Sequence, residues 1–415
     1  MFGATLRRMK RPGPMLALFL TVLIDLLGFA MFIPDIQLRG ESVARMLYGA
    51  DATKGEIGWF VGIMLAAYSV AQLFTSPQLG RWSDIKGRRP VLLLSSALAV
   101  VGYLIYGHWV TPEGMILSRI LTGIAAANLG VAFAYVADTT APEDRAKSLG
   151  MLGAAFGIGF IFGPVLGSQL LKVSNDSPAL LSNVSATLAA VNMVFIYFWL
   201  PESVKPGNQP RTVKPIADLM TALKTPGLGI LIVMFFTVNL CFTNLETTYF
   251  RLLAEPSWIF KFRDPKDSGA LVLAMVGVVG VIVQGVLVRL AVKKYGELTT
   301  LRYAYLIFVP SFVLIPFTPL WFPGVLVIVG LGLGNGLANP SLNALISQRA
   351  PSSMQGGIFG ITQSLGALAR ALGPLMSNPL FSYKPYAPYV VGGLLAMVPL
   401  VAAWTLVKQE PHHAA

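Results

Sequence analysis

Four ionisable side chains lie inside long apolar segments of this 415-residue chain. They are Asp25 in segment 14–37, Arg119 in 114–137, Glu246 in 226–252 and Arg370 in 355–380. If these segments cross a bilayer, each charge at its centre costs at least roughly 2.5–3.5 kcal/mol unless it is solvated or paired. Charges in such places indicate pathways for protons or substrates, so these four residues are the first candidates for function.

The two carboxylates are candidates for binding a proton. Asp25 comes first because it lies near the middle of its segment, with no other charge before Asp35. We expect Asp35, beside Pro34, at the outer surface. For Asp25 the alternative is a permanent hydrogen bond or ion pair. Glu246 is the second candidate, and its alternative is a place at the outer interface.

The two arginines stay cationic at any working pH and would set the charge of a substrate cavity. Arg119 could instead form a structural pair, and Arg370 could extend outward to the membrane interface. Asparagines at helical spacing add polar stripes, as at Asn335 and Asn339. We expect the cavity to be lined by Arg119, Asn128, Asn239, Asn335, Asn339, Gln363 and Arg370.

Signatures of enzymes and cofactors are missing from the sequence. There is no GxxxxGK[ST] loop for phosphates, no nucleophile elbow and no cluster of metal ligands. The single cysteine, Cys241, lies in an apolar segment, so neither a disulfide nor a thiolate metal site is expected. The net charge of +12 does not indicate nucleic-acid binding, because the basic residues lie between apolar segments. We therefore expect no catalytic site, no metal and no cofactor.

The elements that hold these residues are predicted to be membrane-spanning helices. The chain is 55% hydrophobic and only 12% charged, too apolar for a water-soluble domain. Apolar runs of roughly 20 residues, enough to cross about 30 Å of hydrocarbon, recur from end to end. Because they do not alternate as β-barrel strands do, they predict an all-α membrane protein with twelve transmembrane helices. The first run has no cleavage site after it, so we interpret it as a span.

An internal repeat divides the helices into two pseudo-symmetric six-helix bundles. APEDRAKSLGMLGAAFGIGFIFGPVLG begins at Ala141 and APSSMQGGIFGITQSLGALARALGPLMS begins at Ala350. We assign residues 1–200 to an N-terminal bundle, 201–224 to a cytoplasmic linker and 225–415 to a C-terminal bundle. The linker is expected to hold a short interfacial helix. Duplicated halves with a cavity at the midplane are how many secondary transporters achieve alternating access.

The loop GRWSDIKGRRP, from Gly80 to Pro90, combines turn glycines with a carboxylate and basic residues. Gly80 and Gly87 allow a tight turn, and Asp84 and Arg88 supply opposite charges. The basic residues favour a cytoplasmic position. Across all loops, roughly twice as many Lys and Arg fall on the side of the N-terminus as on the other, so both termini are expected in the cytoplasm.

This loop resembles the signature loop of the major facilitator superfamily, where it lies between the second and third helices. IDLLGFAMFIP, SRILTGIAAANLG and LPES are similar to motifs of helices one, four and six in the drug and tetracycline/proton antiporter branch. GIGFIFGPVLG resembles the fifth-helix motif of its exporters. The run around Arg370 is similar to that of tetracycline-transporter-like proteins that move organic anions. The resemblance covers the whole chain.

The resemblance implies roles for two groups of residues. Gly80, Asp84, Gly87 and Arg88 would form a conformational gate, with Asp84 facing the start of the eleventh helix near Ser352 when the cytoplasmic side is closed. In the fifth helix the glycines allow close approach of another helix and the proline bends the chain. That motif comprises Gly153, Gly157, Gly163 and Pro164. One departure is Lys293, which stands in the second half where an equivalent of Asp84 would fall.

The sequence therefore predicts a secondary active transporter that exports a small organic solute in exchange for protons. The solute could be drug-like or an organic anion. One alternative is a proton-coupled or facilitative importer on the same fold, and another is a non-transporting membrane sensor or scaffold. We expect a monomer in a bacterial inner membrane, with the bilayer, protons and a small molecule as its partners and no nucleic acid.

Overall fold

The computed structural model describes residues 13–140, 145–204, 215–255, 265–318, 322–350 and 355–406. Within these ranges, ten segments are helical, long and apolar enough to cross a membrane. The two remaining expected spans correspond to α12, Pro265–Ile282, and α16, Gln355–Tyr383. The chain is an all-α membrane protein, as its composition predicts.

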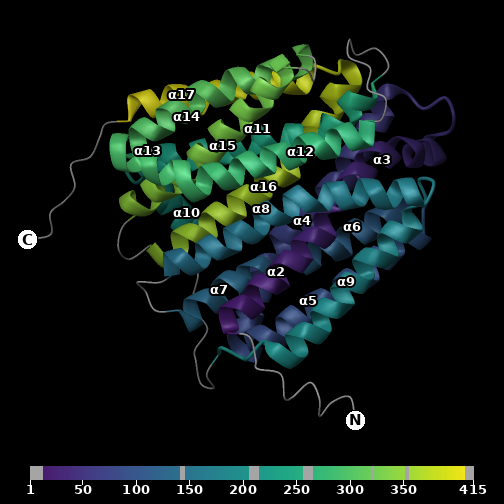
Figure 1. Cartoon of the computed structure of the whole chain (residues 1–415), viewed down its shortest axis with the longest axis horizontal. Helices are drawn as coiled ribbons and strands as arrows, with labels where there is room; N and C mark the ends of the chain where they lie inside the picture. Colours follow the sequence, from purple (N-terminus) through teal and green to yellow (C-terminus); the bar gives the residue numbers. More distant parts are fainter. Residues whose placement is uncertain are drawn as a thin grey trace, which may run out of the picture.

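The described residues of the N-terminal half form eight helices, shown in purple to teal in Figure 1. They are α2 Pro14–Ala30, α3 Ile33–Tyr48, α4 Lys54–Lys86, α5 Arg88–His108, α6 Pro112–Ala126, α7 Leu129–Thr139, α8 Arg145–Val173 and α9 Pro178–Trp199.

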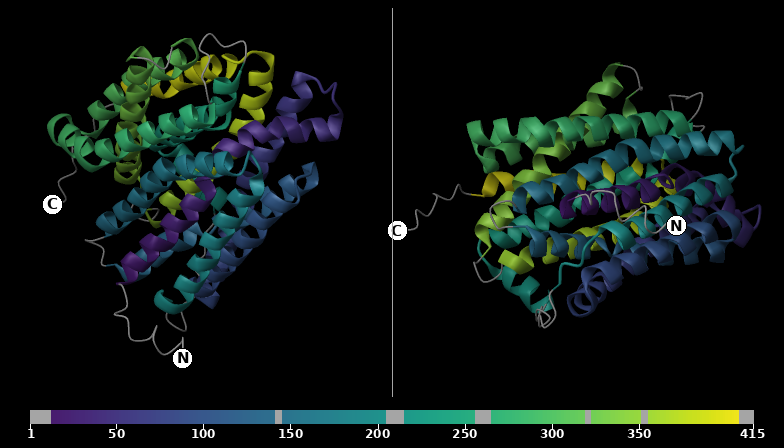
Figure 2. Two further views of the ribbon diagram at one scale, coloured as in Figure 1. Left: turned by 45° about the vertical axis from the view of Figure 1, so that its right-hand side comes forward. Right: turned by 60° about the horizontal axis from the view of Figure 1, so that its bottom comes forward.

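The short helix expected in the linker is α10, Pro215–Lys224. The described elements of the C-terminal half are α11 Leu228–Ala254, α12, the π-helical turn η2 Val283–Leu287, α13 Val288–Tyr295, α14 Glu297–Leu314, the 3-10 turn η3 Ile315–Phe317, α15 Phe322–Arg349, α16 and α17 Ala387–Thr405. The two groups of helices lie side by side in both views of Figure 2.

Two expected spans are interrupted near their middle. The first continues through a break at Met31 and Phe32 and stays helical to Tyr48. Helical structure therefore extends beyond the end expected for the span 14–37, because α3 continues as an amphipathic helix. The fourth span breaks after Ala126, and Asn128 occupies the N-cap of α7.

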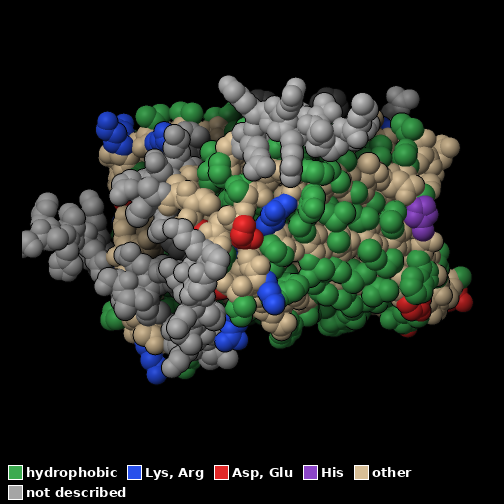
Figure 3. Space-filling model, turned by 90° about the horizontal axis from the view of Figure 1, so that it is seen from below, with side chains coloured by type: hydrophobic (Ala, Val, Ile, Leu, Met, Phe, Trp, Pro, Cys, Tyr) green, Lys and Arg blue, Asp and Glu red, His purple; other side chains and the backbone are tan. Residues whose placement is uncertain are grey.

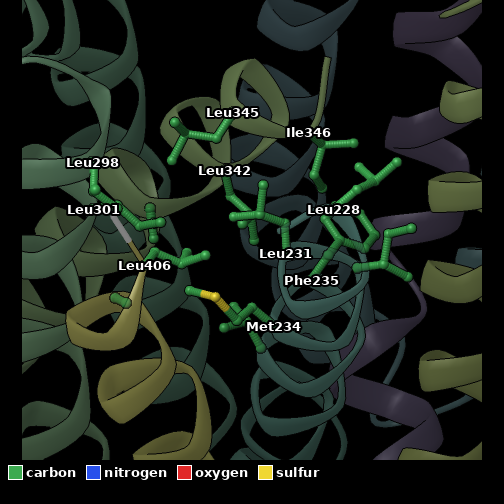
Figure 4. Packing of buried hydrophobic residues seen from close by; sticks show 14 of the residues in the cluster. Leu228, Leu231, Met234, Phe235, Leu298, Leu301, Leu342, Leu345, Ile346 and Leu406 are labelled. Carbon is green, nitrogen blue, oxygen red and sulfur yellow. The ribbon is translucent and has the colours of Figure 1, made fainter. Parts of the chain in front are cut away.

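Each half has its own apolar core. In the C-terminal half, leucines of α11, α14, α15 and α17 point toward one another around Met234 (Figure 4). In the N-terminal half, one cluster joins Ala17 of α2 to Ile196 of α9, and another joins Phe60 of α4 to Leu181 of α9. The two halves meet mainly where α4 contacts α16 and α8 contacts α12.

The helix ends define two opposite faces of the bundle. One end carries the turns at Gly87 and Gly296 and most of the exposed Lys and Arg, so we name it the basic face. The opposite face carries the end of α3 and the turn between α16 and α17. Between them, hydrophobic side chains cover the side of the molecule seen in Figure 3, with Lys and Arg gathered toward one end. This arrangement fits a bilayer around the middle of the bundle.

Candidate functional site

Asp25 is held by two amide side chains of its own half. Asn128 Nδ2 donates to Asp25 Oδ2 at 2.7 Å, and Asn192 Nδ2 donates to Asp25 Oδ1 at 2.8 Å. The break between α6 and α7 turns the Asn128 amide toward α2, and Asn192 reaches Asp25 from α9. Asn128 was predicted from the sequence as a cavity residue; Asn192 was not, although an asparagine inside an apolar run is a detectable signal.

Two buried polar atoms of residues in this region have no hydrogen-bonding partner among the described residues. They are Asn192 Oδ1 and Thr21 Oγ1. Asn192 Nδ2 also donates to the Thr21 carbonyl at 3.3 Å. Buried polar groups are nearly always hydrogen-bonded, so unpaired acceptors beside an acid need an explanation. A protonated Asp25 would have an O–H to donate, and these oxygens could accept it.

Arg119 lies in α6 inside an aromatic cage. Its side chain is 2% exposed, and its guanidinium carbon lies 5.4 Å from the ring centre of Tyr68 and 5.9 Å from those of Phe32 and Tyr106. Nη2 donates to Thr122 Oγ1 at 3.1 Å, whereas the buried Nε has no partner. Among the described residues no carboxylate lies within salt-bridge distance of Arg119. The structural pair considered as its alternative is therefore not present there.

Arg370 and Glu246 face the same region from the C-terminal half. They interact electrostatically but form no salt bridge within the described residues. Tyr68 of α4 interacts electrostatically with charged groups of both halves. These groups are Arg119, Arg370, Glu246 and Asp25. Tyr68 was not predicted, since one tyrosine in an apolar span carries no sequence signal. The side chains of Arg370, Glu246 and Tyr68 all keep partial exposure.

The predicted asparagine stripes are present and partly exposed. Asn339 Nδ2 donates to Asn335 Oδ1 at 2.8 Å along α15, and Asn239 Nδ2 donates to the Phe235 carbonyl at 2.8 Å along α11. The side chain of Gln363 lies outside the described residues. That these groups line a cavity remains a prediction.

The turn at the basic face forms an ion-pair network within the N-terminal half. Arg88 pairs with Asp84 at 2.5 Å and with Asp138 of α7 at 2.9 Å. Glu202, just after α9, accepts the backbone N–H groups of Arg88 at 2.8 Å and Arg89 at 3.1 Å. A carboxylate at the start of a helix is favoured by the free N–H groups and the helix dipole. The LPES sequence, noted as the exit from helix six, was the available signal for Glu202.

Gly87 is required at this turn for two reasons. Its φ of +104° lies in the left-handed region, where side chains are strained. An added Cβ would also collide with the Glu202 carboxylate. Gly80, by contrast, has no neighbour within 4 Å of an added Cβ, so its side of the turn is open. The predicted contact of Asp84 with the start of the eleventh helix involves Ser352 to Gln355, whose side chains lie outside the described residues.

The fifth-helix glycines serve two different contacts. An added Cβ at Gly157 would lie 2.8 Å from Val281 of α12, in the other half, whereas Gly163 packs against Ala30 of its own half. Gly153 has no such neighbour within 4 Å. Pro164 lies inside α8. Only part of the motif, around Gly157, therefore lies between the halves.

Asp35 is buried rather than at the surface, so that expectation is wrong. It is 2% exposed, pairs with Arg39 at 2.7 Å and accepts the Tyr106 hydroxyl at 2.7 Å. The cause is α3, whose helical path turns Asp35 toward α5. Tyr106 thus contacts both Asp35 and the guanidinium of Arg119.

The two halves approach closely toward the opposite face. An added Cβ at Gly58 or Gly62 of α4 would lie 2.8 Å from the backbone oxygens of Asn378 or Pro374 of α16. Phe250 of α11 packs with Ala30 of the N-terminal half. These contacts bring the halves together at that end of the helices.

The protein consists of two halves of membrane-spanning helices, and each half contributes charged groups to a shared region. These features are typical of a membrane transporter. The Major Facilitator Superfamily model matches residues 7–374. The chain belongs to the Major Facilitator Superfamily, and it is a transporter rather than an enzyme. Among the described residues, no cluster of three or more His, Cys, Asp or Glu could hold a metal ion.

Similar proteins include drug-resistance transporters and a vertebrate protein. The chain is 32% identical over 380 residues to the class D tetracycline resistance protein of Salmonella ordonez, with 90% of each protein covered. It is 27% identical over 456 residues to mouse major facilitator superfamily domain-containing protein 10, covering 97% of this chain and 96% of that one. The crystal structure of the human organic anion transporter MFSD10 (TETRAN) has a TM-score of 0.71 and 24% identity, covering 95% and 100%. This structural likeness supports the fold.

Proposed function

We propose that the protein exports a small organic anion in exchange for protons by alternating access. The observation that carries this proposal is a pair of guanidinium groups, one from each half. The guanidinium carbon of Arg119 lies 5.4 Å from the ring centre of Tyr68, and Arg370 interacts with Tyr68 electrostatically. Neither forms a salt bridge within the described residues. A ligand that carries negative charge would supply the missing partner for both.

The chemistry of the region favours an anion with an aromatic group. A guanidinium binds a carboxylate or sulfonate through two parallel hydrogen bonds. Tyr68 stacks on Phe29 with ring centres 4.9 Å apart, which offers an aromatic surface next to the Arg119 charge. Relatives support both parts of the proposal: one is named as an organic anion transporter and others as tetracycline resistance proteins.

Asp25 is proposed as the proton-binding group. In the structure its two oxygens accept from Asn128 and Asn192, which suits the ionised carboxylate. Rotation of the Asn192 amide would present its unpaired Oδ1 to a protonated Asp25. The site thus offers hydrogen-bonding partners for both protonation states, as reversible proton transfer requires.

The basic face is proposed to be cytoplasmic. Lys and Arg are concentrated there, and this excess marks the cytoplasmic side of membrane proteins. Contacts between the halves toward the opposite face support an inward-facing state. Both termini would then lie in the cytoplasm, and the membrane would be a bacterial inner membrane.

Transport in proteoliposomes tests the proposal. The probe is 2-naphthalenesulfonate, which stays ionised and does not cross the bilayer as a neutral acid; tetracycline is measured in parallel. The membrane potential is held at zero with valinomycin and equal potassium. If one anion enters the lumen for each proton that leaves, a difference of about two pH units with the acidic side inside would drive about 100-fold accumulation of the anion in the lumen. Accumulation in an alkaline lumen would indicate an importer, and equilibration to equal concentrations would remove proton coupling.

A further inference from the structure

Gln37 joins the two halves through the backbone of α11. The residue lies on α3 and is 2% exposed. Its Nε2 donates to the carbonyl of Glu246 at 2.5 Å, and its Oε1 accepts the N–H of Phe250 at 3.0 Å. The two backbone groups fix the orientation of the amide, because a carbonyl can only accept and an N–H can only donate.

Glu246 and Phe250 are four residues apart. In an uninterrupted α-helix the N–H of residue 250 donates to the carbonyl of residue 246. The Gln37 amide therefore bonds both backbone groups of one α-helical turn, and α11 is α-helical from Leu228 to Ala254. This contact lies at the backbone of Glu246, the second candidate for proton binding.

We infer that Gln37 is a positioning residue of the transport cycle, which rests on the alternating-access function proposed above. It holds the halves together toward the opposite face. When they separate there, Gln37 passes from the protein interior to water, which takes over its two hydrogen bonds. The helix α11 keeps its own backbone hydrogen bonds in both states. The two direct bonds of Gln37 therefore favour the state closed at the opposite face by a modest free energy.

Neighbouring contacts define the region that Gln37 closes. Phe250 is completely buried and clusters with Ala30 and Ile33 of the N-terminal half. Arg251, next along α11, interacts electrostatically with Glu41, one turn beyond Gln37 on α3. The amide thus lies between an apolar contact and a charged one, all three across the same boundary.

Distances between spin labels measure this equilibrium without any substrate. Exposed positions on the opposite face are Met46 of α3 and Tyr383 at the end of α16, and on the basic face Ile85 of α4 and Tyr295 of α13. Each pair joins the two halves and is changed to cysteine in a Cys241→Ser background. In the unsubstituted protein we expect mainly the short distance for Met46 and Tyr383.

Gln37→Met removes both hydrogen bonds at nearly constant length. Since each bond contributes a few-fold to the equilibrium, we expect the long-distance population of the Met46–Tyr383 pair to rise about tenfold. The Ile85–Tyr295 pair should shorten in the same molecules. Gln72→Met is the matched control, because Gln72 donates to the Ala126 carbonyl within one half at 3.0 Å. It should leave both distributions unchanged.

Gln37→Glu separates hydrogen bonding from packing. Protonated glutamic acid both donates and accepts, as glutamine does, whereas the carboxylate only accepts. We expect the Gln37→Glu variant to give the distance distributions of the unsubstituted protein at pH 5 and those of Gln37→Met at pH 8. Other charged groups on α3 and α11 are Asp35, Arg39, Glu41, Arg45, Glu246 and Arg251, so all variants are measured at both pH values.

Unchanged distances in Gln37→Met would overturn the inference. If that variant does not fold, Gln37→Glu decides alone, because a pH response no larger than in the unsubstituted protein also overturns it. Loss of proton-driven transport with intact distance changes would instead contradict the proposed function and leave this inference standing.

Discussion

Asp25 in the N-terminal half and Glu246 in the C-terminal half both lie in the first span of their half, yet their surroundings differ. Both oxygens of Asp25 accept amide hydrogens from other helices. The Glu246 carboxylate has no hydrogen-bonding partner among the described residues and faces the charge of Arg370. The first carboxylate is thus fixed in place, and the second is free to follow a ligand or a change in the position of α11.

The basic face shows the same contrast. Both halves turn there on a glycine with positive φ, +104° at Gly87 and +78° at Gly296. In the N-terminal half this turn is joined by ion pairs of Arg88 and by Glu202. In the described part of the C-terminal half, Glu297 only accepts from Gln348 at 3.2 Å. The repeat preserves the backbone turn but places the charged network in one half, which suggests a firm N-terminal half against a more adaptable C-terminal half.

The largest expected effect comes from neutralising each carboxylate in turn. Asp25→Asn mimics the protonated form, so we expect the roughly 100-fold gradient-driven accumulation to be lost while exchange of labelled for unlabelled probe continues. Glu246→Gln should keep most accumulation. The measurement is 2-naphthalenesulfonate uptake in proteoliposomes with and without a pH gradient. If the two variants exchange these phenotypes, Glu246 is the proton site and Asp25 is structural.

The arginines test whether both halves bind the anion. Removing one charged hydrogen-bonding partner costs about 1.5–3 kcal/mol, so Arg119→Gln and Arg370→Gln should each weaken binding about 10- to 100-fold. We expect Arg370→Lys to recover part of the affinity, because a charge remains. Arg119→Lys should recover less, since the aromatic cage fits a planar guanidinium. Equilibrium binding of 2-naphthalenesulfonate in detergent measures this, and equal affinity in all variants would point to a different substrate site.

Much of the fold could be predicted because membrane crossing imposes a simple pattern. Uninterrupted apolar runs, the repeat and the basic loops gave the helices and their division, and the linker helix was found at Pro215–Lys224. The continuation of the first span as a second, amphipathic helix could not be predicted. An apolar run and the amphipathic α3 join at Phe32, and the interior side of α3 includes Asp35 and Gln37, which look like surface residues in sequence.

The candidate site was predictable where a charge interrupts an apolar run. Asp25, Arg119, Glu246 and Arg370 meet this criterion, and all four interact electrostatically with Tyr68. Tyr68, Asn192 and Gln37 were missed because their importance depends on which helices pack together. Spacing along one helix shows its faces, but it does not show what lies opposite each face.

A smaller effect is expected from the network of the basic face. Glu202→Gln keeps an acceptor but loses the charge at the start of α5, and we expect about 1 kcal/mol lower stability because the group is exposed. Glu297→Gln, the matched change in the C-terminal half, should have little effect. Thermal unfolding in detergent compares the two variants. If both variants lose the same stability, the charged network does not make the N-terminal half more stable at this face than the C-terminal half.

The smallest effect in this state is expected for Asp84→Asn. Asp84 is 28% exposed, and Arg88 keeps Asp138 and the Ser83 hydroxyl when the pair is lost, so unfolding should change by about 0.5 kcal/mol or less. The proposed contact of Asp84 with the start of α16, in the state closed at the basic face, would contribute roughly 0.3–1 kcal/mol through the helix dipole. Losing this contact should change the ratio of the two states, measured from the spin-label distance distributions, by up to about fivefold in favour of the state closed at the opposite face. A stability loss as large as that of Glu202→Gln, with unchanged distances, would make Asp84 part of the fixed network and leave the gate elsewhere.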